Sequence, residues 1–288
     1  MNARTPLVAL GPLALPGREP SRSSAILKGS ASSSLRWCFL ALFLLGGRLD
    51  GISYAAQPPQ SPAAIPRLDP NAVAIMRQMS DYLGGLKAFT VHCVTSSEVM
   101  LTTGQKVQYL SAYDAMLRRP DRYHSRLLGP DEWQFYYDGK TYTAYGVQAK
   151  YYASAPVPGG LDRVLDALQE RFGTELPALD LLYSKIFEGM MPQVTDALYL
   201  GVEQVSGVTV HHLAFRTPEV DWQIWIADGA KPLPYRYLIT SKLEPGALQH
   251  CAELSNWNTA PKIDDASFVF RPPAGVKKVD FLTVKQPK

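Results

Sequence analysis

Between residues 89 and 257 the chain consists largely of short segments in which apolar and polar residues alternate. A period of two places successive side chains on opposite faces of a β-strand. Turn residues such as Thr103-Gly104 and Asp138-Gly139 separate the segments, and glycine there supplies a positive φ. The pattern therefore predicts an antiparallel meander. The predicted strands are FTVHCVTSSEVML (89–101), QKVQYLSAYDAML (105–117), DRYHSRLL (121–128), EWQFYYD (132–138), KTYTAYG (140–146), ALYLGVEQVSG (197–207), VTVHHLAFR (208–216), VDWQIWIAD (220–228), PYRYLITSK (234–242), ALQHCAELSNW (247–257) and, at the close of the chain, ASFVFRPPAGVKKVDF (266–281).

Helical spacing appears in two places. Asp69-Pro70 predicts a helix start, with proline at the first helical position, and apolar residues then recur at helical spacing as far as Gly84-Gly85. The second place is a helical insertion at 161–195, in which 161–172 predicts an amphipathic helix and 177–191 a second, almost wholly apolar one.

The order of the elements predicts an antiparallel α+β domain, because no βαβ alternation repeats. A sheet of about 10–11 strands cannot stay flat, since strand twist makes it curl into a half-barrel. The N-terminal helix and the helical insertion, acting as a lid or plug, would then cover its concave face. That arrangement makes either a hydrophobic cavity or a filled core, and the pattern fits both.

The N-terminal region predicts export. Residues 37–45 (WCFLALFLL) are apolar but too short for a membrane-spanning helix, and the small residues of SYAAQ (53–57) follow. We expect a signal peptide at 1–56, a Pro-rich disordered leader at 57–68, a single domain at 69–282 and a tail at 283–288. The expected location is the periplasm of a Gram-negative bacterium.

Export removes the basic character of the chain. Residues 1–56 hold six of the 29 Lys and Arg residues and two of the 26 acidic residues, which leaves a net charge of −1. The basic balance of the whole chain is therefore no argument for a nucleic-acid partner. No further transmembrane span is predicted, although transient contact with an envelope membrane is possible, and the oligomeric state is left open.

The remaining cysteines, Cys93 and Cys251, lie in separate predicted strands. The oxidising compartment permits a disulfide between them, but two free thiols are favoured. No nucleophile elbow, metalloprotease helix, phosphate loop or Cys-x-x-Cys is present. Adjacent strand residues such as His211 and His212 point to opposite faces and cannot share a metal. We expect no cofactor, no metal and no catalytic site.

Aromatic residues are concentrated within about twenty positions of the chain. They are Trp133, Phe135, Tyr136, Tyr137, Tyr142, Tyr145, Tyr151 and Tyr152. Ordinary cross-strand aromatic pairing explains them and is favoured. The alternative is an amphipathic lining for an apolar ligand.

The chain resembles periplasmic lipoprotein carriers of the LolA type. The matching features are Arg119-Pro120, Tyr123, Pro130, Asp138-Gly139-Lys140-Thr141, Tyr145, the helix end at Leu86 and Phe89, and a final Phe268-x-Phe270-x-Pro272-Pro273-x-Gly275-Val276. Its sequence, including the segments LRRPDR (117–122) and VDWQIWI (220–226), looks closer to that of predicted periplasmic proteins of domain of unknown function 2092. That family is held to be similar in fold to LolA, LolB, LppX and RseB.

The resemblance implies a site. In the carriers, the arginine before the proline hydrogen-bonds the helical lid, and the aromatic residue after it lines the entrance. Arg119 would then be the latch, because a guanidinium satisfies several carbonyl groups at once, and Tyr123 would line the entrance. Arg118 and Arg122 are read as a possible solvated strand end. The expected cavity lining is Phe135, Tyr137, Leu182, Phe187 and Trp222.

The function implied is non-catalytic binding of a hydrophobic ligand, either a lipid, an acyl chain or a lipidated protein. The alternative, from the likeness to RseB, is a periplasmic sensor or interaction domain that binds a protein partner. A third possibility is an enzyme whose site is assembled from scattered residues.

Overall fold

The computed structural model describes residues 67–172 and 178–281. The predicted signal peptide, most of the predicted leader and nearly all of the predicted tail lie outside these residues. The helices are α1 (Pro70–Gly85), α2 (Leu161–Phe172) and α3 (Ile186–Met190), with 3-10 helices η1 (Leu179–Leu182), η2 (Met191–Gln193) and η3 (Asp265–Phe268). No helix of the described part of the chain is both long enough and apolar enough to span a bilayer.

Twelve strands form one sheet. They are β1 (Ala88–Met100), β2 (Lys106–Arg118), β3 (Arg122–Leu128), β4 (Trp133–Tyr137), β5 (Thr141–Gly146), β6 (Tyr151–Pro156), β7 (Asp196–Val205), β8 (Val208–Arg216), β9 (Val220–Ala227), β10 (Pro234–Ser241), β11 (Gln249–Asn258) and β12 (Lys277–Val279). Their order is β12-β6-β5-β4-β3-β2-β1-β11-β10-β9-β8-β7, antiparallel except that β12 runs parallel to β6. The predicted antiparallel α+β class is confirmed.

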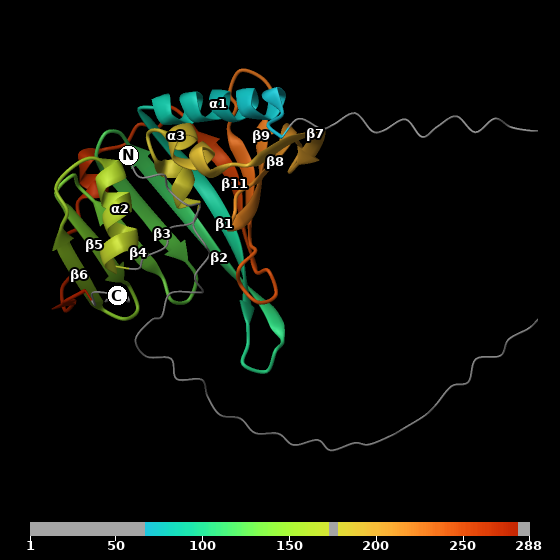
Figure 1. Cartoon of the computed structure of the whole chain (residues 1–288). Helices are drawn as coiled ribbons and strands as arrows, with labels where there is room; N and C mark the ends of the chain where they lie inside the picture. Colours follow the sequence, from blue (N-terminus) through green and yellow to red (C-terminus); the bar gives the residue numbers. More distant parts are fainter. Residues whose placement is uncertain (1–66, 173–177, 282–288) are drawn as a thin grey trace, which may run out of the picture. The chain divides into compact units, whose positions relative to one another are not determined.

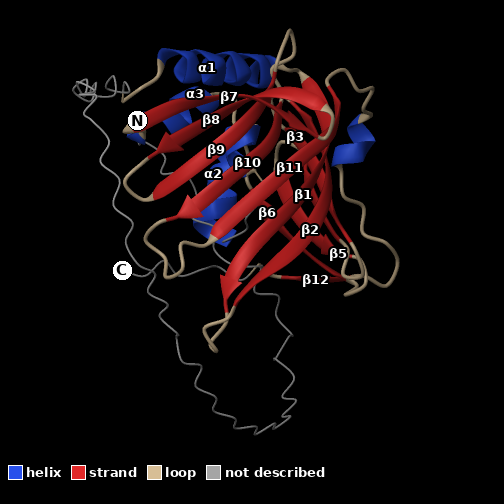
Figure 2. Cartoon of the chain, turned by 90° about the vertical axis from the view of Figure 1, so that its right-hand side faces the viewer, coloured by secondary structure: helices blue, strands red, loops and turns tan. Residues whose placement is uncertain are grey.

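Helices cover one face of this sheet, which we call the inner face. Figure 1 shows α1 lying across the upper ends of the strands and α2 in front of the strands β3 to β5, with α3 between the two helices. Figure 2 shows the sheet from its side, with α1 above it and the strands splayed by twist. Side chains of the helices and of the inner face form one buried apolar cluster.

Helix α1 begins where the sequence predicts. Asp69 accepts a hydrogen bond from the Asn71 amide at 2.8 Å, and Pro70 occupies the first turn. The cap satisfies an amide that has no partner within the helix, and the ring of proline fits that turn. Just before it, Arg67 and Asp69 pair with Ala197 on β7, so the end of the predicted leader is attached to the edge of the sheet.

One strand was not predicted from the sequence, and another was predicted wrongly. β6 pairs with β5 in full register and brings the sheet to 12 strands rather than about ten or eleven. The predicted last strand at 266–281 is wrong over most of its length. Its first part forms η3, capped by Asp264, and only β12 pairs with the sheet. Pro272 and Pro273 between them carry no amide hydrogen for a ladder.

The predicted helix at 177–191 is also wrong. Its described part forms η1, α3 and η2, and we call residues 178–193 the lid segment. Two side chains interrupt a continuous helix by binding its amides. Asp162 accepts from the Ser184 amide at 2.9 Å, and Ser80 Oγ accepts from the Phe187 amide at 2.9 Å. Apolar composition alone does not reveal that these amides are bound from other helices.

The two cysteines are free thiols, as favoured from the sequence. Cys93 lies opposite Leu254, whereas Cys251 lies opposite Ser96. Cys93 and Cys251 therefore point to opposite faces of neighbouring strands, which precludes a bond between them. Burial raises the pKa of Cys93 to about 12, so its thiol stays protonated.

At Gly84 the backbone of α1 lies close to the lid segment. A Cβ at Gly84 would lie 2.5 Å from the backbone oxygen of Ser184, whereas a Cβ at Gly85 would meet nothing within 4 Å. We expect Gly84→Ala to destabilise the protein by about 1–3 kcal/mol through overpacking. Gly85→Ala, the matched control, should be neutral or stabilising by up to about 1 kcal/mol. Urea denaturation measures both, and equal free energies of unfolding for the two variants would contradict this close contact.

Candidate functional site

Arg119 joins the sheet to the lid segment. It follows the last residue of β2, and its amide donates to Lys87 at 2.8 Å, which fixes the start of its side chain. Its Nη2 donates to the carbonyl oxygens of Leu182 at 3.2 Å and of Tyr183 at 3.1 Å. Burial lowers the pKa of Arg119, and the nearby carboxylate of Asp162 partly opposes this shift. The structure thus brings the predicted latch residue to the predicted lid, while its role in opening stays a prediction.

The same part of the lid segment is held from α2 as well. Asp162 receives hydrogen bonds from the Ser184 amide and, at 2.6 Å, from the Ser184 hydroxyl. Tyr183 donates to Asp166 at 3.0 Å. The start of α2 is itself fixed, because the Leu161 amide donates to the Pro120 carbonyl at 2.8 Å. The connection after β2 therefore positions Arg119 and α2 together.

The other contacts of the lid segment reach α1 and the floor of the sheet. Arg77 on α1 lies 3.7 Å above the Phe187 ring and pairs with Glu188 at 3.3 Å. On the floor, Tyr237 donates to Asp180 at 3.2 Å. Burial raises the pKa of Tyr237, and the neighbouring Asp180 carboxylate adds to the rise. The lid segment is thus attached by polar contacts around its perimeter.

Tyr123 lies on the inner face and is buried, 3 % exposed. It pairs across the ladder with Leu117 and Tyr137. Burial raises the pKa of Tyr123. Tyr137 donates to the carbonyl oxygens of Val157 at 2.9 Å and Gly159 at 2.6 Å, which fastens the connection between β6 and α2. Tyr137 thus contacts the approach to α2 rather than an open space.

The five predicted lining residues come together in the interior. Phe135, Tyr137, Leu182, Phe187 and Trp222 all belong to the inner apolar cluster and are at most 9 % exposed. Trp222 stacks on Phe215 with ring centroids 4.0 Å apart, so ordinary aromatic pairing accounts for this contact. In this structure the predicted lining side chains are buried in that cluster, and two of them, Leu182 and Phe187, belong to the lid segment itself. Whether they line a cavity when a ligand is present stays a prediction.

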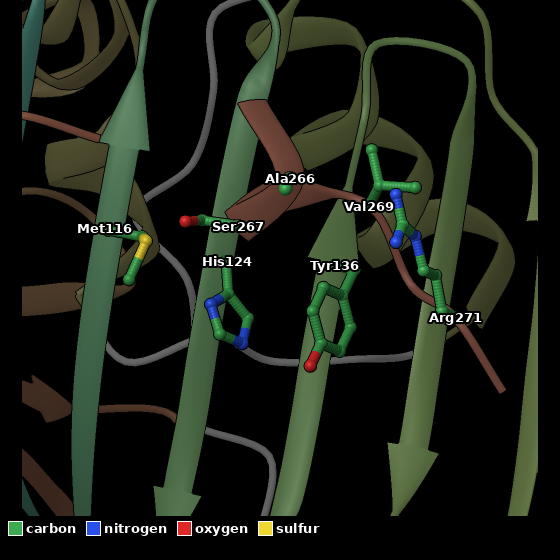
Figure 3. A pocket seen from close by; sticks show the side chains of 7 residues that line it. All are labelled: Met116, His124, Tyr136, Ala266, Ser267, Val269 and Arg271. Atoms are coloured by element: carbon green, nitrogen blue, oxygen red, sulfur yellow. The ribbon is translucent and has the colours of Figure 1, made fainter. Parts of the chain in front are cut away.

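A pocket that the sequence did not predict lies on the outer face, opposite the helices. Its volume is about 400 Å³. Figure 3 shows that Met116, His124 and Tyr136 project from neighbouring strands β2, β3 and β4, beneath the passing C-terminal segment. We call residues 264–281 the C-terminal strap. The lining residues are Met116, His124, Tyr136, Ala266, Ser267, Val269 and Arg271.

The strap is held on the outer face by Phe268 and Phe270. Phe268 is fully buried, and the Arg118 guanidinium lies 5.2 Å above its ring and pairs with Asp265. Phe270 contacts the rings of Tyr136, Tyr145 and Tyr152 on β4, β5 and β6 at 4.9–5.5 Å. The Phe-x-Phe motif therefore anchors a strap rather than a strand. Arg118 is correspondingly no solvated strand end.

His124 is the unusual residue of the outer pocket. Its ring stacks on Tyr136 with centroids 4.3 Å apart. Both ring nitrogens are buried and have no hydrogen-bond partner among the described residues. Burial, with a smaller effect of Arg126, lowers the pKa of His124 to about 4. Period-two alternation places positions 124 and 136 on the face opposite Tyr123 and Tyr137, but the covering strap could not be read from it.

No group of three or more His, Cys, Asp or Glu residues in 67–172 and 178–281 has the arrangement of a metal site. Histidines occur here in other settings. His212, for example, bonds Glu203 at 2.8 Å and Gln223 at 2.9 Å and stacks on Trp225. This satisfied network is structural in character and offers no free ligand atom on the imidazole.

Comparisons with known proteins identify a family. The model described as "Predicted periplasmic protein (DUF2092)" matches residues 72–282. Among solved structures, lipoprotein LppX of Mycobacterium tuberculosis has 17% identity and a TM-score of 0.43, covering 68% of this chain and 100% of that chain. MucB has 14% identity and a TM-score of 0.41, covering 70% of this chain and 63% of that chain. A LolA superfamily protein from Nitrosomonas europaea has 10% identity and a TM-score of 0.36, covering 69% and 97%. A search of curated proteins found no match.

The buried His124 makes a prediction about acid stability. A histidine in the unfolded chain titrates near pH 6.5, whereas the pKa of His124 in the folded protein is lowered to about 4. Between these values the unfolded chain binds the proton and the folded protein does not, so stability falls as the pH drops from about 6.5 to about 4. His124→Phe removes this contribution. Its free energy of unfolding, measured by urea denaturation at several pH values, should fall less over that window than that of the wild type. Parallel pH profiles would contradict the burial of a neutral imidazole.

Proposed function

This chain belongs to the DUF2092 family of predicted periplasmic proteins, and we propose that it binds a hydrophobic ligand between the inner face of the sheet and the lid segment. The ligand is a lipid or the acyl part of a lipidated protein. The role is carriage or storage without chemistry. The contact of Arg119 with the carbonyl oxygens of Leu182 and Tyr183 is the observation that carries this proposal.

The burial of Arg119 beneath a separable segment is what supports a latch. Withdrawing a guanidinium from water is costly unless hydrogen bonds compensate. Here both acceptors described for the guanidinium belong to the lid segment, while its Nε is buried without a partner among the described residues. The arginine therefore has a direct energetic preference for the closed position. A ligand that displaces the lid segment must supply apolar contact to the side chains now covered by it.

The floor beneath the lid segment is suited to an acyl chain. The inner face of the sheet presents aromatic and aliphatic side chains, including Trp222 and Phe135. The indole Nε1 of Trp222 is buried and has no hydrogen-bond partner among the described residues. Because buried donors are normally paired, a ligand carbonyl, such as that of an acyl ester, would satisfy this one. An apolar chain with one carbonyl acceptor therefore fits the floor.

The lid prediction uses Arg119→Leu, which keeps much of the apolar stem and removes the donors. Hydrogen bonds from a charged donor contribute about 1.5–3 kcal/mol, so the open state should gain about 10- to 150-fold in population. Hydrogen exchange should quicken in 178–193 more than in β9, and an environment-sensitive hydrophobic dye should bind more tightly. The fold should survive, since β9 and α1 make no contact with the guanidinium through the hydrogen bonds described.

Arg122→Leu is the matched control. Arg122 pairs with Asp121 at 2.8 Å rather than with the lid segment. We expect hydrogen exchange of residues 178–193 in this variant to match that in the wild type. Faster exchange in Arg122→Leu with no change in Arg119→Leu would mean that Arg122 holds the lid segment, and it would reject the assignment to Arg119. No change in either variant would remove the support for an opening lid.

Copurification tests the ligand class. We expect native mass spectrometry of protein isolated from its own periplasm to show a bound species in the mass range of a lipid, released by organic extraction. A stoichiometric polypeptide in its place would favour the sensor or interaction function. Protein that carries neither, and that binds no fatty acid or phospholipid in vitro, would contradict the carrier proposal.

A further inference from the structure

We propose that the outer pocket is a second binding site, for a small carboxylate with a flat apolar body, separate from the ligand under the lid segment. The inference rests on the pocket between His124, Tyr136 and the strap residues, and it does not depend on the proposed carrier function. Its volume of about 400 Å³ lies within the range of small-molecule sites.

The polar groups of this pocket favour an acceptor. Ser267 offers a hydroxyl and Arg271 a guanidinium. No carboxylate side chain lines the pocket. Among the described residues, the two acids of the strap nearest in sequence are engaged elsewhere. Asp264 accepts from the Ala266 amide at 3.3 Å, and Asp265 pairs with Arg118.

The apolar walls determine the body of the ligand. Met116 and Val269 are flexible or aliphatic, and Tyr136 presents a ring already held parallel to His124. Tyr136 donates its hydroxyl to Gln134, which fixes the ring. A planar group can lie against these surfaces while its carboxylate reaches Arg271, because a guanidinium fork matches a carboxylate in shape.

His124 contributes a flat ring surface to the pocket. Its ring is held parallel to Tyr136 with centroids 4.3 Å apart. Both ring nitrogens are buried, so neither is open to a hydrogen bond from a ligand in the pocket. The polar recognition of a ligand therefore falls to Arg271 and Ser267.

The test uses 4-phenylbutyrate and its uncharged analogue 4-phenylbutan-1-ol as probes, with calorimetry at pH 7. The wild type should bind the acid at least about 10-fold more tightly than the alcohol, the difference expected of a charge-assisted hydrogen bond. Arg271→Gln should weaken binding of the acid by about 10-fold or more and leave binding of the alcohol unchanged. Equal binding of acid and alcohol would reduce the pocket to an apolar gap and overturn the proposal, as would no saturable binding of the acid.

Three further variants keep the outcome specific. Arg126→Gln is the matched control. Arg126 lies on β3, the strand that carries His124, but it pairs with Glu132 outside the pocket. The variant should bind the acid like the wild type. His124→Phe keeps a flat ring in the pocket wall, so it should raise the urea midpoint of the free protein and bind the acid like the wild type. Unaltered binding in Arg271→Gln would overturn the assignment. Arg119→Leu should leave acid binding unchanged, and a change there would mean that the probe enters beneath the lid segment instead.

Discussion

At the end of β2, two consecutive arginines attach a different covering segment to each face of the sheet. Arg118 lies over Phe268 and pairs with Asp265 of the C-terminal strap. Arg119 donates to carbonyl oxygens of the lid segment. Successive side chains along a strand point to opposite faces of the sheet. A single strand end therefore contributes to the attachment of both covering segments.

Both coverings are needed because this sheet is aromatic on both faces. Tyr123 and Tyr137 face the helices, while Tyr136 and Tyr145 face the strap. Exposing either aromatic face to water would be unfavourable. The helices give the inner face a deep apolar core. The strap is thin and can bury the outer face only locally, around Phe270. A narrow cover over a wide face leaves a hollow between the two, and the outer pocket lies there.

Local features were predictable from the sequence, whereas coverage was not. Asp69-Pro70, the turn glycines and the alternation of β1 to β5 each depend on neighbouring residues, and all were found in place. β6 was missed because its alternating residues after Tyr152 are small, and its pairing comes from β5 and β12. The strap and the interrupted lid depend on partners far along the chain. Arg119 was identified only through a family resemblance, and its contact with the lid carbonyls is now visible, while its function remains a prediction.

The polar perimeter of the lid segment has a consequence for what a ligand must do. Arg119, Asp162 and Tyr237 each bind this segment through hydrogen bonds, and such bonds exchange readily with water when the lid lifts. The apolar contacts of the middle, around Phe187, do not exchange in this way, because water gives them nothing in return. Opening therefore costs the exposure of apolar surface in addition to the loss of these hydrogen bonds, and the apolar part of the cost disappears only if another apolar body takes the vacated place. Polar contacts set where the lid closes, and the hydrophobic effect determines what can hold it open.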